Sequence, residues 1–288
     1  MSKLCNYVKL MRMKHYLKNG LVLLPLFFGR QALNKGLLLH GVVGFLAFCL
    51  VSSAVYVFND LQDVEKDRNH PTKRHRPIAS GAVSKTEAWI VLILCLAAAI
   101  AVSIAVHQPT ISYVALVVYI ALNVGYSMSW KNVALLEIII LVFGFLVRLM
   151  YGSYVTGIAI SGWLYLTVVS ISFYLGFGKR RNEWKLQQES EAMDTREVLR
   201  HYSESFLNRS MTVFLCTSIV FYSLWAEQQD NPYLLWSVPV VMLLALRYSQ
   251  DVEKSDASGD PIEMIYGDPV LWLIGIISVA IIMVGVYH

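Results

Sequence analysis

Residues 36–58 read GLLLHGVVGFLAFCLVSSAVYVF, a stretch without a single Lys, Arg, Asp or Glu. An α-helix needs about 20 predominantly apolar residues to cross the hydrocarbon core of a bilayer. Residues 88–106 and 271–286 repeat this pattern elsewhere in the chain. The stretch therefore predicts a membrane-spanning helix, and its recurrence predicts a polytopic integral membrane protein.

The composition of the 288-residue chain also favours a membrane protein. Apolar residues make up 56% and charged residues 15%, whereas an ordinary soluble domain has about 25% charged residues. The four cysteines are scattered without a CxxC pair, which argues against a disulfide framework and against a zinc site. We expect no cleaved signal peptide and no nucleic-acid partner.

The apolar stretches predict an all-α fold of nine transmembrane helices in a single domain over residues 1–288. The helices are expected at residues 17–34, 37–60, 85–106, 109–128, 132–151, 161–178, 207–227, 232–249 and 268–287. Longer polar loops are expected at about 60–85, 179–207 and 250–268. Long loops in a compact protein usually carry function.

The distribution of positive charge predicts the orientation. With these nine crossings, 21 of the Lys and Arg residues fall on the side of the N-terminus, and only Arg30 and Lys35 fall on the other. Loops rich in Lys and Arg stay in the cytosol. We therefore expect a multi-pass protein of the cell (inner or plasma) membrane, with its N-terminus and a central cavity open to the cytosolic face.

Acidic residues close the second predicted helix in the run NDLQDVEKD, which begins at residue 59. If the helix continues, Asn59, Asp63 and Asp67 share one face at a spacing of four. Asp60 lies beside them, and Tyr56 lies one turn earlier. Oxygen ligands of this kind suit Mg²⁺ that carries a substrate phosphate. The alternative is a solvated helix end, which we disfavour because carboxylates in a membrane-embedded helix are costly.

A basic loop follows, in which Lys73, Arg74 and Arg76 precede the run PIASG. Cations next to a metal-binding acidic face suit a diphosphate, because the metal neutralises some phosphate oxygens and the cations bind the others. The alternative is positive-inside bias or contact with lipid headgroups. The adjacent acidic face favours the phosphate site.

A second basic cluster lies in the run GKRRNE at the end of the sixth predicted helix. Lys179, Arg180 and Arg181 complement the helix dipole there, which is the purely structural alternative. Three successive cations with Glu183 close behind exceed what helix capping requires. We therefore favour a second phosphate pocket.

Five further residues are candidates for the same cavity. Arg148 lies in an apolar run, where an unpaired guanidinium costs at least about 2.5 kcal/mol. It therefore needs an anionic partner on the substrate or on another helix. Tyr126 and Lys131 lie at one cytosolic helix end, and Lys14 and Lys18 share a face at the start of the first crossing.

The pattern Asn59-Asp60-x-x-Asp63-x-x-x-Asp67 resembles the first aspartate motif of the UbiA-type intramembrane prenyltransferase superfamily. The resemblance implies nine transmembrane helices around a central cavity. Most members bind a polyprenyl diphosphate through magnesium held by two aspartate-rich motifs. Here the second motif, usually DxxxD, is replaced by GKRRNE.

One acidic and one basic cluster suit two phosphorylated substrates, of which one is a diphosphate. This combination resembles the decaprenyl-phosphate phosphoribosyltransferase branch, in which 5-phosphoribosyl 1-diphosphate donates its phosphoribosyl group to a polyprenyl phosphate. The likeness extends to Met11-Arg12, to Leu17-Lys18-Asn19, to residues 70–84, to Arg247-Tyr248 and to Gly259-Asp260-Pro261 with Glu263 and Asp268-Pro269. Glu137 stands where superfamily members often have Asp.

The resemblance implies Mg²⁺ as cofactor, held by residues of the acidic run: Asn59, Asp60, Asp63 and Asp67. It implies a donor pocket formed by Lys18, Tyr56, Lys73, Arg74 and Arg76. Lys131, Arg148, Lys179 and Arg180 are then candidates for the donor's 5-phosphate and the lipid phosphate. Lys14, Tyr126 and Glu183 complete the candidate substrate-binding residues.

Two other functional classes stay open. A prenyltransferase that acts on an aromatic or quinone precursor would use the same fold, but the second motif lacks its paired carboxylates. A transporter or magnesium channel would place charged residues at mid-bilayer and on both sides, whereas these charges gather on one face. The sequence also leaves open whether the protein is a homo-oligomer.

Overall fold

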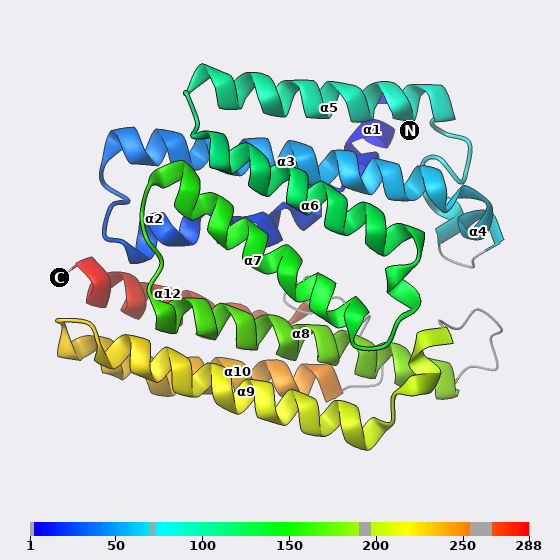
Figure 1. Cartoon of the computed structure of the whole chain (residues 1–288). Helices are drawn as coiled ribbons and strands as arrows, with labels where there is room; N and C mark the ends of the chain where they lie inside the picture. Colours follow the sequence, from blue (N-terminus) through cyan, green and yellow to red (C-terminus); the bar gives the residue numbers. More distant parts are fainter. Residues whose placement is uncertain (1–2, 70–72, 190–196, 254–266, 288) are drawn as a thin grey trace. The chain divides into compact units, whose positions relative to one another are not determined.

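The computed structural model describes residues 3–69, 73–189, 197–253 and 267–287, and all regular structure in these ranges is helical (Figure 1). The chain divides into two compact units. Unit 1 comprises Met1–Trp130 and Val147–Ala159, and unit 2 comprises Lys131–Leu146 and Ile160–His288. The single domain predicted over residues 1–288 stays a prediction.

Seven helical segments among the described residues are long and apolar enough to cross a membrane. They are α3 (Lys35–Gln62), α5 (Lys85–Ala105), α6 (Thr110–Met128), α7 (Leu136–Thr156), α9 (Glu204–Glu227), the segment Pro232–Glu253 that holds η5 and α10, and α12 (Pro269–Tyr287). The all-α polytopic membrane protein is confirmed. The count of nine crossings is not, because the other two predicted helices do not meet these criteria.

The first predicted crossing, at 17–34, is not one regular α-helix. The short α1 (Lys3–Leu10) is followed by the 3-10 helix η1 (Met13–Leu23) and the five-residue α2 (Leu24–Phe28). Pro25 lies in the first turn of α2, where its missing N–H costs no helical hydrogen bond. Tertiary contact also shapes this segment, since a Cβ atom on Gly152 of α7 would lie 2.0 Å from the carbonyl oxygen of Val22.

Unit 1 is built around α3, along which α5 and α6 run (Figure 1). Phe48 and Val51 of α3 are buried with Tyr119 of α6 and Tyr151 of α7. A second cluster joins Leu10 and Val57 to residues of α5 and of the loop that precedes it. Side-chain caps fix where the helices begin. Asn34 accepts hydrogen bonds from the first N–H groups of α3, and Ser84 and Glu87 form a capping box at the start of α5.

Unit 2 contains α8 (Gly162–Glu189), η4 (Glu197–His201), α9, η5 (Pro232–Trp236), α10 (Ser237–Glu253) and α12. The prediction of a loop from residue 179 is wrong for residues 179–189, where α8 continues. These residues contain no Gly or Pro and favour helix, although they are too polar for the bilayer core. Helix α8 packs along α9 (Figure 1), with the rings of Phe173 and Phe214 stacked 4.5 Å apart.

Candidate functional site

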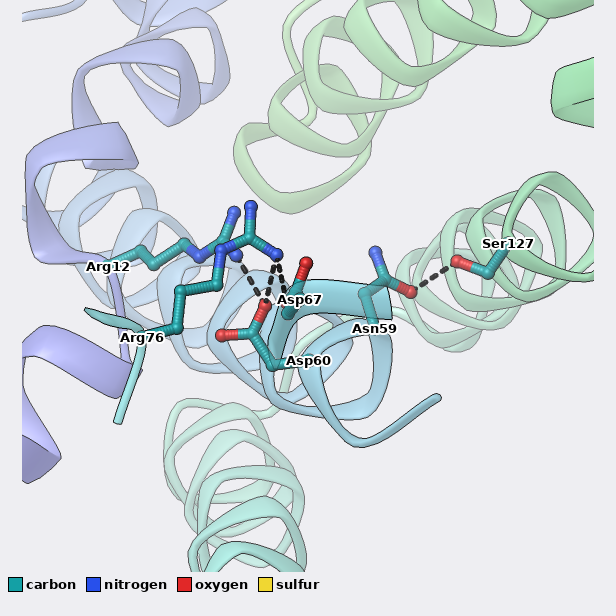
Figure 2. Close-up of polar contacts among 6 residues, drawn as sticks. All are labelled: Arg12, Asn59, Asp60, Asp67, Arg76 and Ser127. Carbon is teal, nitrogen blue, oxygen red and sulfur yellow. Dashed lines mark hydrogen bonds and ion pairs between the residues drawn. The ribbon is translucent and has the colours of Figure 1, made fainter. Parts of the chain in front are cut away.

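The acidic run at residues 59–67 does not form one continuous helix, although the sequence pattern assumed that it would. Helix α3 ends at Gln62, Asp63 adopts a non-helical conformation, and α4 (Val64–Asn69) begins directly after it. Asn59 faces α6, where its Oδ1 accepts a hydrogen bond from Ser127 Oγ at 2.5 Å (Figure 2). Asn59 and Asp67 therefore have different partners, since Asp67 pairs with Arg76.

Four charged side chains meet at the end of α3, and we call Arg12, Asp60, Asp67 and Arg76 the charged cluster (Figure 2). Arg76 Nη1 lies 3.2 Å from Asp60 Oδ1 and 2.7 Å from Asp67 Oδ2. Arg12 Nη2 contacts the same oxygen of Asp60. Asp60 is 2% exposed and Asp67 is 4% exposed. Burial of this kind requires that the carboxylates be neutralised, and the two guanidinium groups do so.

Local packing positions the two segments that carry Asp67 and Arg76. Val64, at the start of α4, is buried together with Ile78 and Val83 of the following loop. That loop is tied to itself by backbone bonds, including Val83 N–H to the Pro77 carbonyl at 2.9 Å and the Arg76 N–H to the Lys73 carbonyl at 2.9 Å. The loop therefore presents Arg76 toward α3. Gly81 turns the chain with a φ of 78°, a conformation that suits glycine.

The donor atoms of the cluster fit a divalent cation such as Mg²⁺. Asp60 and Asp67 converge on one guanidinium nitrogen, so both point toward the same positive charge. Among the residues that the structure describes, no three His, Cys, Asp or Glu side chains form a metal site by themselves. Magnesium in proteins is commonly bound by one or two carboxylates together with substrate phosphates and water. A site with two carboxylates therefore fits a metal that is bound with a phosphorylated substrate.

The predicted donor-pocket residues differ in their burial and in the contacts that they make with this cluster. The Tyr56 ring lies beneath Arg12, with the guanidinium carbon 5.1 Å from the ring centroid. Lys18 is partly buried in η1, whereas Lys73 and Arg74 are exposed in the short helix η2 (Lys73–His75). Of the three basic loop residues that we predicted, the structure brings Arg76 into direct contact with the carboxylates.

Arg148 is held deeper in unit 1 by uncharged side chains. Its Nε donates to Asn19 Oδ1 at 2.8 Å, and its Nη2 donates to the Tyr119 hydroxyl at 2.9 Å. The guanidinium also lies over the rings of Phe48 and Tyr119, at 5.3 and 4.8 Å. Hydrogen bonds and cation–π contacts both lower the cost of a buried charge. The predicted anionic partner of Arg148 stays a prediction.

The second basic run lies in unit 2, where its middle residue is part of a buried ion-pair network. Arg180 Nε lies 2.8 Å from Glu137 Oε1, and both side chains are 0% exposed. Arg180 Nη1 also pairs with Glu183. The Tyr202 hydroxyl donates to Glu137 at 3.5 Å and accepts from the Leu135 N–H at 2.7 Å. Burial raises the pKa of Tyr202, so it remains a donor at neutral pH.

The neighbours of Arg180 face other partners. Arg181 donates to Asn208 Oδ1 at 2.5 Å and to the Val252 carbonyl at 3.2 Å, which ties α8 to α9 and α10. These two contacts give Arg181 a structural role in unit 2. Lys179 is partly buried.

The remaining predicted residues lie at helix ends. Lys14 is exposed in η1, Tyr126 is partly buried in the last turns of α6, and Lys131 is partly buried in η3 (Trp130–Asn132). In the C-terminal segment of the resemblance, Arg247 Nε donates to Asp268 Oδ2 at 2.5 Å. The predicted residues Gly259, Asp260, Pro261 and Glu263, and residues 70–72 of the basic loop, lie outside the described residues.

Sequence reasoning missed four residues of these networks as site candidates: Arg12, Ser127, Tyr202 and Asn208. Arg12 is 48 residues from Asp60, and Ser127 is 68 residues from Asn59. No local spacing links such pairs. The resemblance of Met11-Arg12 to the phosphoribosyltransferase branch was the one available signal for Arg12.

The sequence matches the UbiA prenyltransferase family over residues 22–274. The chain belongs to the UbiA prenyltransferase family. It is 32% identical to the decaprenyl-phosphate phosphoribosyltransferase of Corynebacterium glutamicum, over 97% of this chain and 86% of the relative. It is 33% identical to the enzyme of that name from Mycobacterium tuberculosis, over 95% of this chain and 91% of the relative.

Solved structures of this family share the fold. A UbiA homolog from Archaeoglobus fulgidus bound to GPP and Mg²⁺ superposes with a TM-score of 0.71, covering 98% of this chain and 99% of the homolog. The sequence identity of that pair is 18%, so the likeness extends to the fold alone. The predicted membership of the UbiA superfamily is confirmed.

Proposed function

We propose that the protein transfers the 5-phosphoribosyl group from 5-phosphoribosyl 1-diphosphate to a polyprenyl phosphate of the decaprenyl type, with release of diphosphate. The observation that carries this proposal is the similarity, over nearly the full length, to enzymes named for that reaction. The charged cluster supports it, because a pair of carboxylates between two arginines suits a substrate that arrives as a metal diphosphate.

In the proposed reaction, an oxygen of the lipid phosphate attacks C1 of the ribose. The new C1–O bond forms as the bond from C1 to the diphosphate oxygen breaks, and the electron pair leaves with diphosphate. A phosphate monoester is already anionic, so the step needs no general base. Positioning of the two anions and stabilisation of charge on the departing diphosphate then supply most of the catalysis.

The donor would bind at the charged cluster. We propose that Asp60 and Asp67 hold the divalent cation, with Asp63 and Asn59 beside them at the end of α3. Magnesium, when bound, neutralises the diphosphate and stabilises it as a leaving group. Arg76 would bind diphosphate oxygens, with Lys73 and Arg74 at the solvent side and Tyr56 and Lys18 closing the pocket.

For the second phosphorylated group, the remaining candidates are Lys14, Arg148 and the Tyr126 hydroxyl in unit 1, and Lys131 and Lys179 in unit 2. Arg180 and Glu183 would position the binding residues rather than contact the substrate, because Arg180 already pairs with both Glu183 and the buried Glu137. The lipid tail needs an apolar path out of the site, which explains why this chemistry would belong to a membrane-embedded enzyme. We place the N-terminus and the site on the cytosolic side of the cell membrane.

The other candidate function is a prenyltransferase that acts on an aromatic or quinone precursor. Membership of the family favours it. The arginine and lysine residues that replace the second aspartate motif disfavour it, because they leave no second pair of carboxylates for a metal.

The test is product formation in detergent micelles from radiolabelled phosphoribosyl diphosphate and decaprenyl phosphate, with and without Mg²⁺. Wild type is compared with Asp60→Asn and Asp63→Ala, each checked for wild-type elution and thermal stability. A labelled lipid that requires Mg²⁺ and Asp60 supports the proposal. Turnover of a prenyl diphosphate with an aromatic acceptor, and no labelled lipid, would refute it in favour of the other candidate.

A further inference from the structure

Arg12 is held in place by its backbone as well as by its side chain. It lies between α1 and η1 with φ 52° and ψ 47°, a left-handed conformation that is unusual for a residue with a side chain. Contacts of the two preceding residues help to fix it there. Leu10 is fully buried, and the Met11 carbonyl accepts a hydrogen bond from Ser53 Oγ at 2.9 Å. This turn directs the Arg12 guanidinium over Tyr56 and onto Asp60.

Arg12 and Arg76 converge on one carboxylate oxygen. Both contact Oδ1 of Asp60, and Arg76 bridges to Asp67 through the same nitrogen (Figure 2). The cluster of two arginines and two aspartates has no net formal charge. The arginine side chains keep part of their surface exposed, at 23% and 29%, whereas the Asp60 side chain is 2% exposed. The cations can therefore move toward solvent more readily than the carboxylates.

We propose that Arg12 and Arg76 form an exchangeable clamp on the metal-binding carboxylates. In the structure the two guanidinium groups pair with Asp60 and Asp67. When the metal diphosphate arrives, they transfer to diphosphate oxygens and leave the carboxylates to the metal. This inference rests on the proposed function for the identity of the donor, and it adds Arg12 to the residues that bind it.

The physical reason for exchange is competition for the same oxygen. A divalent cation on Oδ1 of Asp60 would lie close to two guanidinium groups, and like charges at such distances repel strongly in a buried site. A diphosphate offers the guanidinium groups new acceptors in bidentate geometry, so their hydrogen bonds are replaced. The metal alone provides the guanidinium groups with no hydrogen-bond acceptor.

The clamp therefore predicts that the metal binds weakly alone and tightly with a diphosphate. Removing Arg12 should have opposite effects on the two ligands. The metal alone should bind more tightly, because one competitor for Asp60 is gone. The diphosphate should bind less tightly, because it loses a charged donor. A residue that merely supports the fold would weaken both.

The experiment measures binding to purified full-length protein in detergent micelles for wild type, Arg12→Gln, Arg12→Lys and the control Lys66→Gln. Lys66 is exposed on α4, so its substitution removes a nearby positive charge outside the charged cluster. Free Mn²⁺ is followed by electron paramagnetic resonance without any phosphate. Binding of labelled inorganic diphosphate is then measured at saturating Mn²⁺, and the labelled phosphoribosyl donor is measured in parallel.

For Arg12→Gln we expect Mn²⁺ affinity to rise about ten-fold and diphosphate affinity to fall about ten-fold, the usual scale of one charge-assisted hydrogen bond. Arg12→Lys should lie between Arg12→Gln and wild type, and Lys66→Gln should match wild type in both. Unchanged or weaker Mn²⁺ binding by folded Arg12→Gln would overturn the clamp. Opposite shifts with Mn²⁺ and inorganic diphosphate, but no binding of the phosphoribosyl donor, would uphold the clamp and refute the proposed donor.

Discussion

Removal of Arg180 should destabilise unit 2 more than an ordinary substitution, because it would leave a carboxylate buried without its main counter-charge. Glu137 and Arg180 are both 0% exposed, and their charged atoms are 2.8 Å apart. Breaking a buried pair by removing one partner costs about 3–5 kcal/mol, because the remaining charge stays desolvated. We expect Arg180→Met to lower the free energy of unfolding by that amount.

A double-mutant cycle separates this effect from a simple loss of packing. Replacement of a buried pair by apolar groups of similar size is often close to neutral. Arg180→Met combined with Glu137→Leu should therefore recover at least half of the stability that Arg180→Met loses. Arg180→Lys should recover little, because one ammonium cannot reproduce contacts from two guanidinium nitrogens to Glu137 and Glu183.

The assay is equilibrium unfolding in mixed micelles, followed by tryptophan fluorescence, for wild type, Arg180→Met, Glu137→Leu, Arg180→Lys and the double variant. A coupling energy of about 2 kcal/mol or more between the two positions agrees with a buried, mutually dependent pair. A cost below about 1 kcal/mol for Arg180→Met, or strict additivity in the double variant, would refute the reasoning. Either result would mean that Glu137 reaches solvent or another cation in the folded protein.

The remaining predictions concern activity, packing and pH. Asp60→Asn should reduce lipid product at least about 100-fold per folded molecule, because the donor loses its charged metal ligand. A rate within five-fold of wild type, a difference of about 1 kcal/mol, would contradict this role. Gly152→Ala should lower the free energy of unfolding by about 1–3 kcal/mol, because the new Cβ would lie 2.0 Å from the Val22 carbonyl oxygen. The control Gly162→Ala has open space around its Cβ and should cost little, and melting curves compare the two variants. The hydrogen bond from Arg247 holds the pKa of Asp268 well below its usual range, so the carboxylate contributes stability above the unfolded pKa of about 4 and loses it as the pH falls through the folded value. The melting temperature of wild type should therefore exceed that of Asp268→Asn by a constant amount from pH 8 to about 5, and this difference should shrink only in more acidic buffer; a difference that changes near pH 7 would contradict the assignment.

The regular helices were largely predictable because bilayer thickness imposes a length on apolar runs. Residues 37–60 were predicted where α3 spans Lys35–Gln62, and 109–128 where α6 spans Thr110–Met128. The end of α8 was missed because the hydropathy pattern marks where a helix leaves the membrane. Helix propensity decides where the helix itself ends, and residues 179–189 favour helix. The irregular η1 was missed because hydropathy carries no information on its close contact with α7.

The candidate site was predictable in its residue types but not in its pairing. The acidic run and the basic loop were both identified, and the structure joins them through Arg76, Asp60 and Asp67. The spacing of four placed Asn59 with Asp63 and Asp67, yet the helix breaks at Asp63 and Asn59 turns to Ser127. Contacts between residues so far apart in the chain depend on tertiary structure, which a local pattern does not encode.

The most direct test of the proposed transfer uses two forms of phosphoribosyl diphosphate, one with ³²P in the 5-phosphate and one with ³²P in the β-phosphate of the diphosphate. Each is incubated with decaprenyl phosphate, Mg²⁺ and the wild-type protein in micelles, and the lipid and aqueous phases are counted. The proposal predicts that the 5-phosphate label enters the lipid phase while the β-phosphate label is released as diphosphate. Entry of the β-phosphate label into the lipid, or of neither label from folded protein, would contradict phosphoribosyl transfer.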